Sequence, residues 1–189
     1  MARFMEGLSM LGGRYFVGLG LPDYAREKLA QLQGNFRGLH FIPLENYHLT
    51  LKFIGEIGSG PIAEVRARLE EVAVPAFILE LGGVGRFPDD PLPPRVVWAG
   101  LERPPPQLFH LQQKIENAAL QAGIEPSTRA FRPHVTLAHV SQDAGNAANE
   151  WLKLHRGFAS APFRVEGFNL FRRCPETGRY LVEATFALA

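Results

Sequence analysis

Residues 48–53 read His-Leu-Thr-Leu-Lys-Phe, and residues 134–139 read His-Val-Thr-Leu-Ala-His. In both stretches a histidine stands two residues before a threonine, and an apolar residue separates them. Successive side chains of a β-strand point to opposite faces, so this alternation predicts a half-buried strand that carries the histidine and the threonine on one face. One such triplet arises by chance on many strands. Its repetition indicates that the two strands are used together.

The two histidines supply the chemistry that this pattern points to. An imidazole titrates near neutral pH, so one ring can accept a proton while another donates one. Transfer of a phosphoryl group to water needs both proton transfers. We therefore expect His48 and His134 to form a general acid–base pair on two neighbouring strands.

The composition is that of an ordinary globular protein. With 189 residues, the chain can form one domain or two small lobes that share a core. Lys+Arg 20 against Asp+Glu 19 gives a net charge of +1, which argues against a long electrostatic track along duplex nucleic acid. A nucleic-acid ligand is expected to be an end or a short single-stranded piece.

Localisation is predicted from what the sequence lacks. Residues 1–13 contain no apolar run of signal-peptide length, and we expect them to be an N-terminal extension. No stretch approaches the ~20 apolar residues of a membrane span. The single cysteine, Cys174, has no second thiol to pair with, which fits a reducing compartment. We expect a cytoplasmic monomer without a membrane partner.

The hydrophobic spacing predicts alternating strands and helices. Expected strands cover residues 14–19, 41–42, 48–55, 77–81, 95–99, 131–140, 163–171 and 180–188, and expected helices cover 61–72, 107–122 and 147–154, with one more opening at 22–23. The Gly- and Pro-rich residues 82–94 are predicted to be a break without regular structure. Both halves run strand, helix, histidine-bearing strand, helix and further strands. This order predicts an α+β fold built from a duplicated unit, with a pseudo-two-fold axis that brings the histidine-bearing strands face to face.

Other side chains near the two motifs are interpreted from the same alternation. Arg132 stands two residues before His134 and shares its face if the chain stays extended, so we interpret it equally well as a phosphate ligand or as a solvated residue at a strand end. Lys52 is read as a solvated lysine, and the parity of Phe53 favours the core. A metal site that includes His139 is disfavoured, because no Asp, Glu or Cys residues cluster beside the histidines.

Residues 45–55, Glu-Asn-Tyr-His-Leu-Thr-Leu-Lys-Phe-Ile-Gly, and 131–137, Phe-Arg-Pro-His-Val-Thr-Leu, closely resemble the paired motifs of the 2H phosphoesterase superfamily. The branch that they resemble most is that of the LigT-like RNA 2',3'-cyclic phosphodiesterases, also called 2'-5' RNA ligases. The resemblance runs from residues 15–19 through 96–100 to 178–180. It implies a bilobal α+β fold, with antiparallel sheets facing a central cleft, helices on the outside, and no metal or other cofactor.

The resemblance also implies roles for individual residues. His134 would activate water and His48 would protonate the leaving O3' of a 2',3'-cyclic phosphate at an RNA end, which yields a 2'-phosphate. Thr50 and Thr136 would hold the phosphate. The reverse reaction would join RNA ends through a 2'-5' linkage without ATP.

One position departs from the family pattern. Family members commonly carry an arginine where His139 stands, so His139 and Arg132 are the further candidates for phosphate binding. The parity of His139 is opposite to that of His134, and a bulge or a strand end is needed to bring it to the same face.

Two other functions remain open at this point. The chain could be a phosphodiesterase acting on small cyclic nucleotides or on ADP-ribose cyclic phosphate. It could also be a module that binds a nucleotide phosphate without turning it over. Product analysis separates these alternatives.

Overall fold

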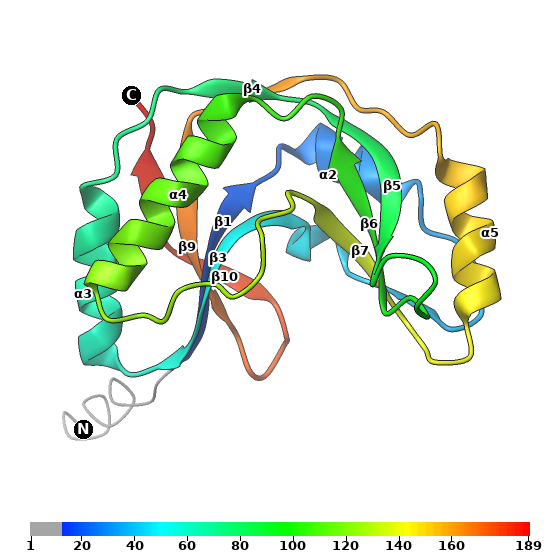
Figure 1. Cartoon of the computed structure of the whole chain (residues 1–189), viewed down its shortest axis with the longest axis horizontal. Coiled ribbons are helices and arrows are strands. Elements are labelled where there is room, and N and C mark those ends of the chain that lie inside the picture. The colour runs from blue at the N-terminus through cyan, green and yellow to red at the C-terminus, as the bar shows by residue number, and fades with distance from the viewer. Residues whose placement is uncertain (1–12) are drawn as a thin grey trace.

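The computed structural model describes residues 13–189 (Figure 1). The expected N-terminal extension therefore lies outside the described residues, except for Gly13, which begins the first strand. The elements are β1 (Gly13–Gly20), α2 (Asp23–Ala30), β2 (Leu39–Phe41), the short 3-10 helix η2 (Leu44–Asn46), β3 (His48–Ile57), α3 (Ser59–Glu70), β4 (Phe77–Leu79), β5 (Leu81–Phe87), β6 (Val96–Leu101), α4 (Pro106–Gln121), β7 (Val135–Val140), α5 (Gly145–His155), β8 (Phe163–Val165), β9 (Gly167–Arg173) and β10 (Tyr180–Ala187).

The main sheet has the strand order β10-β9-β1-β3-β7-β6-β5, with β2 also paired to β7. Strands β4 and β8 pair separately, and all the strand pairs are antiparallel. The order is symmetric about the boundary between β3 and β7: β1 corresponds to β6, and β9 corresponds to β5. The predicted α+β fold is confirmed, and the two histidine-bearing strands are neighbours in one continuous sheet.

The helices bury their apolar faces against one side of this sheet. In α4 the buried residues Leu108, Leu111, Ile115 and Ala119 recur every three or four positions, which is the spacing of one helix face. Figure 1 shows α3 and α4 together at one side of the molecule and α5 at the other. In α5 the fully buried Trp151 donates its indole N–H to the carbonyl of Leu32, 2.8 Å away, and so ties this helix to the end of α2.

The structure corrects the predicted break over residues 82–94. Residues 81–87 form strand β5, and only the part from 88 onward is a loop. The glycines do not interrupt the strand, because a Cβ atom at Gly85 would lie only 2.2 Å from the ring of Trp98 on the neighbouring strand β6. Glycine at this position makes room for the indole.

Two predicted strand boundaries also differ. The second histidine-bearing strand begins at Val135 rather than at residue 131, and the preceding Pro133 has no amide hydrogen to give to a ladder. The single strand expected over residues 163–171 is two strands, because β8 pairs with β4 and β9 pairs with β1.

Candidate active site

Strands β3 and β7 meet at one residue pair, Leu49 and Val135, both completely buried. Because the strands are antiparallel, the residue before Leu49 lies across from the residue after Val135. His48 therefore faces Thr136, and Thr50 faces His134. All four side chains point away from the buried pair, toward the side that we call the open face of the sheet. The register brings the four predicted residues together.

A β-bulge follows the threonine in both strands. The register of β3 against β1 skips Leu51, and the register of β7 against β6 skips Leu137. An extra residue of this kind reverses the alternation of side chains beyond it. The bulge therefore decides which of the residues directly after it are buried.

This reversal shows that two predictions are wrong. Lys52 is not solvated: its side chain is 2% exposed and bonds to Glu116 inside the protein. Phe53 is not in the core: it is 71% exposed. Simple alternation fails at both positions for the same reason, because it takes no account of the unpaired Leu51.

The sequence predicts that His139 reaches the face of His134 only beyond a bulge or a strand end, and β7 has such a bulge. Leu137 and Ala138 are both fully buried, so alternation resumes with His139 exposed, on the open face with Thr136. His40 is its partner on β2. The binding role of His139 stays a prediction.

Backbone carbonyls orient both imidazoles. Nδ1 of His48 lies 2.7 Å from the carbonyl of Asn46, and Nδ1 of His134 lies 2.6 Å from the carbonyl of Arg132. A carbonyl only accepts, so Nδ1 carries the proton and donates it in each ring. Nε2 of each neutral ring then keeps a lone pair. At His48 this nitrogen lies 3.0 Å from Oγ1 of Thr50, whose hydroxyl donates to it.

Aromatic side chains surround both histidines. Phe16 and Tyr180 lie 4.5 and 5.0 Å from His48 between ring centroids, the second edge-on. Phe87 lies edge-on 4.9 Å from His134. Sequence reasoning missed these rings. They could not be found without the strand order, because they come from β1, β10 and β5.

Burial sets the charge of the pair. Desolvation lowers the pKa of His48 from 6.5 to about 4, the Asn46 carbonyl opposes this shift, and the charge of His134 adds to it. Desolvation also lowers the pKa of His134, against the effect of its bond to the Arg132 carbonyl. In the free protein both rings are therefore neutral at neutral pH.

Arg132 has a carboxylate partner beside this pair. Its guanidinium donates two hydrogen bonds to the carboxylate of Asp89, with N···O distances of 2.7 and 3.2 Å. The Cζ atom of Arg132 lies over the ring of Phe87, 4.5 Å from the ring centroid. The hydrogen bond from Arg132 is the main reason why the pKa of Asp89 is lowered. The reading of Arg132 as a simple solvated strand end is thus incomplete, since its side chain is half exposed but paired.

Among residues 13–189, no three or more His, Cys, Asp or Glu side chains gather where they could hold a metal ion. Within the same range no helix combines the length and the apolar character needed to cross a membrane.

The chain is similar to known proteins in family, in sequence and in structure. A family model described as the 2'-5' RNA ligase superfamily matches residues 21–175. An RNA 2',3'-cyclic phosphodiesterase of Aeropyrum pernix is 40% identical over 96 residues, which cover 51% of this chain and about half (54%) of that protein. The RNA 2',3'-cyclic phosphodiesterase of Escherichia coli K12 is 31% identical over 138 residues, or 69% of this chain and 74% of that protein. The crystal structure of E. coli LigT complexed with 3'-AMP superposes with a TM-score of 0.77 and 26% identity, covering 94% of this chain and 99% of the other.

Proposed function

Since the chain belongs to the 2'-5' RNA ligase superfamily, we propose that it hydrolyses RNA 2',3'-cyclic phosphate ends to 2'-phosphates by two-histidine acid–base catalysis. The single observation that carries this proposal is the antiparallel pairing of Leu49 with Val135, which directs both imidazoles to one face of the sheet. The names of the two relatives above support the choice of substrate.

In the proposed reaction, the oxygen of a water attacks phosphorus while Nε2 of His134 takes the water's proton. The bond from phosphorus to O3' breaks, and O3' receives a proton from Nε2 of His48. The products are a 2'-phosphomonoester and a free 3'-hydroxyl, and solvent returns each ring to its starting state. Before the attack on phosphorus, His48 takes up a proton from solvent at Nε2, because the bound anionic phosphate favours the protonated imidazole and so offsets its desolvation.

Neighbouring groups support the phosphate. In the proposed complex, the hydroxyls of Thr50 and Thr136 donate to its non-bridging oxygens, where charge grows in the transition state. The Thr50 hydroxyl is released for this bond once Nε2 of His48 carries a proton. His139 and Arg132 are proposed as further phosphate ligands. Phe53 exposes its ring on the open face, where the base of an RNA end finds a surface for stacking.

The assignment of acid and base is tested by a substrate that needs no acid. Replacing the bridging O3' by sulfur makes a leaving group that departs without a proton. We expect this cyclic thiophosphate to restore turnover in His48→Ala but not in His134→Ala. Rescue of His134→Ala instead would reverse the two roles.

The function itself is tested by product analysis. The protein, treated with EDTA, is incubated with an oligonucleotide ending in a 2',3'-cyclic phosphate, with 2',3'-cyclic AMP and with ADP-ribose cyclic phosphate. We expect conversion of the oligonucleotide to a 2'-phosphate, read by phosphorus NMR, and 2'-5' joining when a 5'-hydroxyl RNA is added in excess. Faster turnover of a small nucleotide would favour the alternative substrate class, and binding without turnover would favour a binding module. Action as a cytoplasmic monomer stays a prediction.

A further inference from the structure

Lys52, two residues beyond Thr50, is bound inside the protein by residues from the other half of the chain. Its ammonium donates to Oε1 of Glu116 at 2.6 Å, to the carbonyl of Glu125 at 2.7 Å and to the hydroxyl of Ser127 at 3.1 Å. An ammonium has three donors, so these three acceptors satisfy it completely.

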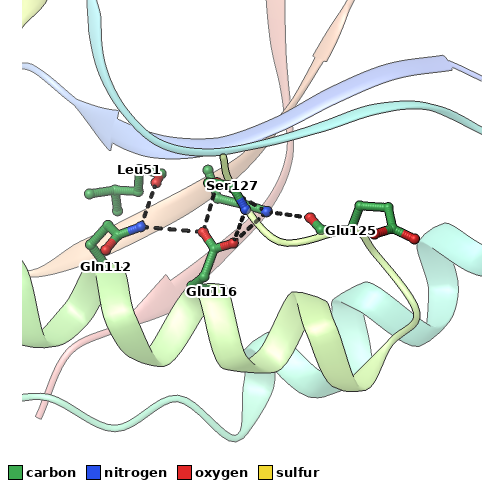
Figure 2. A network of polar contacts seen from close by, with 6 residues as sticks. Leu51, Gln112, Glu116, Glu125 and Ser127 are labelled. Atoms are coloured by element: carbon green, nitrogen blue, oxygen red, sulfur yellow. Dashed lines mark hydrogen bonds and ion pairs between the residues drawn. The ribbon is translucent and has the colours of Figure 1, made fainter. Parts of the chain in front are cut away.

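Glu116, on α4, belongs to the same network (Figure 2). It accepts the backbone N–H of Ser127 at 2.6 Å and the hydroxyl of Ser127 at 2.9 Å, on its two different oxygens. Gln112, one turn earlier, reaches toward Glu116 and toward the carbonyl of Leu51. Burial alone would raise the pKa of Glu116, but the hydrogen bonds from Lys52 and Ser127 lower it overall, so the carboxylate stays charged.

The network connects the two halves of the candidate site. On one side it holds Leu51 and Lys52, the bulge that directly follows Thr50. On the other side it holds Glu125 and Ser127, after which residues 128–134 run to the second histidine without forming a helix or a strand. The sheet itself joins β3 to β7 through one residue pair. The network is therefore a second attachment between the two histidine-bearing segments.

Stability alone gives little reason for such a network. A buried ion pair loses much of its Coulomb energy to desolvation, and apolar side chains of similar size often replace it without loss of stability. Its benefit is geometric, because the short directional bonds fix one segment relative to the other.

We propose that Lys52 and Glu116 are positioning residues, which hold the segment carrying His134 in register with the strand carrying His48 and Thr50. The inference rests on the proposed function in taking both histidines to act on one phosphate. Displacement of a reacting group by about 1 Å can cost on the order of 100-fold in rate.

The main test uses the double variant Lys52→Met/Glu116→Gln, which removes both charges together and leaves no unpaired ion. Ser127→Ala is the second variant, because Ser127 is exposed and its loss leaves the core intact. Val165→Ala, a buried position in β8, is the control for lowered stability. All are compared at a temperature at which each is fully folded by circular dichroism.

Two measurements decide the proposal. We expect kcat of the double variant to fall by roughly 10- to 100-fold, with a smaller change in KM, a smaller loss of kcat in Ser127→Ala, and no loss in Val165→Ala. In NMR spectra of histidine-labelled protein, the ring signal of His134 should lose the shift caused by Phe87, while that of His48 keeps the shift caused by Phe16.

Unchanged kcat together with an unchanged His134 signal in the double variant would overturn the proposal, as would equal losses in the double variant and in Val165→Ala. If the double variant does not fold, Ser127→Ala decides by the same two measurements. If the unaltered protein hydrolyses no cyclic phosphate, the proposed function fails, and the imidazole spectra still decide whether the network holds His134.

Discussion

Leu49 and Val135 are partners across the boundary between β3 and β7, and each directly follows a histidine of the candidate pair. Because the strands are antiparallel, each histidine lies opposite the threonine of the other strand. Each histidine is also two residues from the threonine of its own strand, on the same face. The four polar side chains thus form one group around the pseudo-two-fold axis. In the proposed reaction, this arrangement provides two proton carriers and two hydroxyl donors for one phosphate.

Replacing either histidine by alanine should reduce kcat by on the order of 10²- to 10⁴-fold, since in the proposed reaction each ring performs one proton transfer. The variants should stay folded, which circular dichroism checks, because both rings lie at half-buried positions on the open face. Initial rates on a cyclic-phosphate oligonucleotide measure the effect. His110→Ala is the matched control, since His110 is exposed on α4 and outside the site. A variant of His48 or His134 with normal kcat would exclude that ring from the chemistry.

Removing one hydroxyl should be less severe than removing a ring. For Thr50→Val or Thr136→Val we expect a loss of roughly 10- to 100-fold in kcat/KM, the worth of a hydrogen bond to a charged oxygen. Thr50→Ser and Thr136→Ser keep the hydroxyl and should keep most of the activity. Equal losses in the serine and valine variants would assign the threonines a packing role only.

The lowered pKa of His48 should make stability depend on pH. Between pH 6.5 and about 4 the unfolded chain binds a proton on this ring and the folded protein does not. The free energy of unfolding should therefore be greatest above pH 6.5 and fall as the pH drops toward 4, and His134 adds to the same trend. Urea titrations at several pH values measure the slope. His48→Gln should reduce it, and an undiminished slope in this variant would contradict the burial effect.

The ion pair between Arg132 and Asp89 predicts a variant with improved binding. Asp89 neutralises the guanidinium that we propose as a phosphate ligand. Asp89→Asn should therefore tighten the binding of inorganic phosphate by about 2- to 5-fold, in keeping with the modest strength of exposed ion pairs. Titration calorimetry measures the change, and Arg132→Gln added to Asp89→Asn should remove the gain. Unchanged affinity in Asp89→Asn would place Arg132 outside the phosphate site.

The sequence predicts the parts of this architecture that depend on local patterns. The repeated histidine-x-threonine triplets identify β3 and β7, and the helices α3 and α4 are confirmed with ends shifted by only one or two residues. The order of elements in the two halves predicts the duplicated α+β fold, because each half must bury similar apolar faces.

What the sequence does not predict depends on contacts between distant segments. The bulges at Leu51 and Leu137 exist in the pairing with β1 and β6, so alternation along β3 alone placed Lys52 and Phe53 on the wrong sides. The glycines of β5 are typical of a loop in the sequence. Only the contact with Trp98 on the neighbouring strand explains why residue 85 is a glycine within a strand. The partner of Arg132 lies on the loop after β5, and no local pattern links the two.

The most direct test is a crystal structure of the protein with inorganic phosphate bound. We predict one phosphate on the open face, with Nε2 of His48 and Nε2 of His134 both within hydrogen-bonding distance of its oxygens and on opposite sides of phosphorus. A phosphate held by one imidazole alone, or two imidazoles directed to separate ions, would contradict the account.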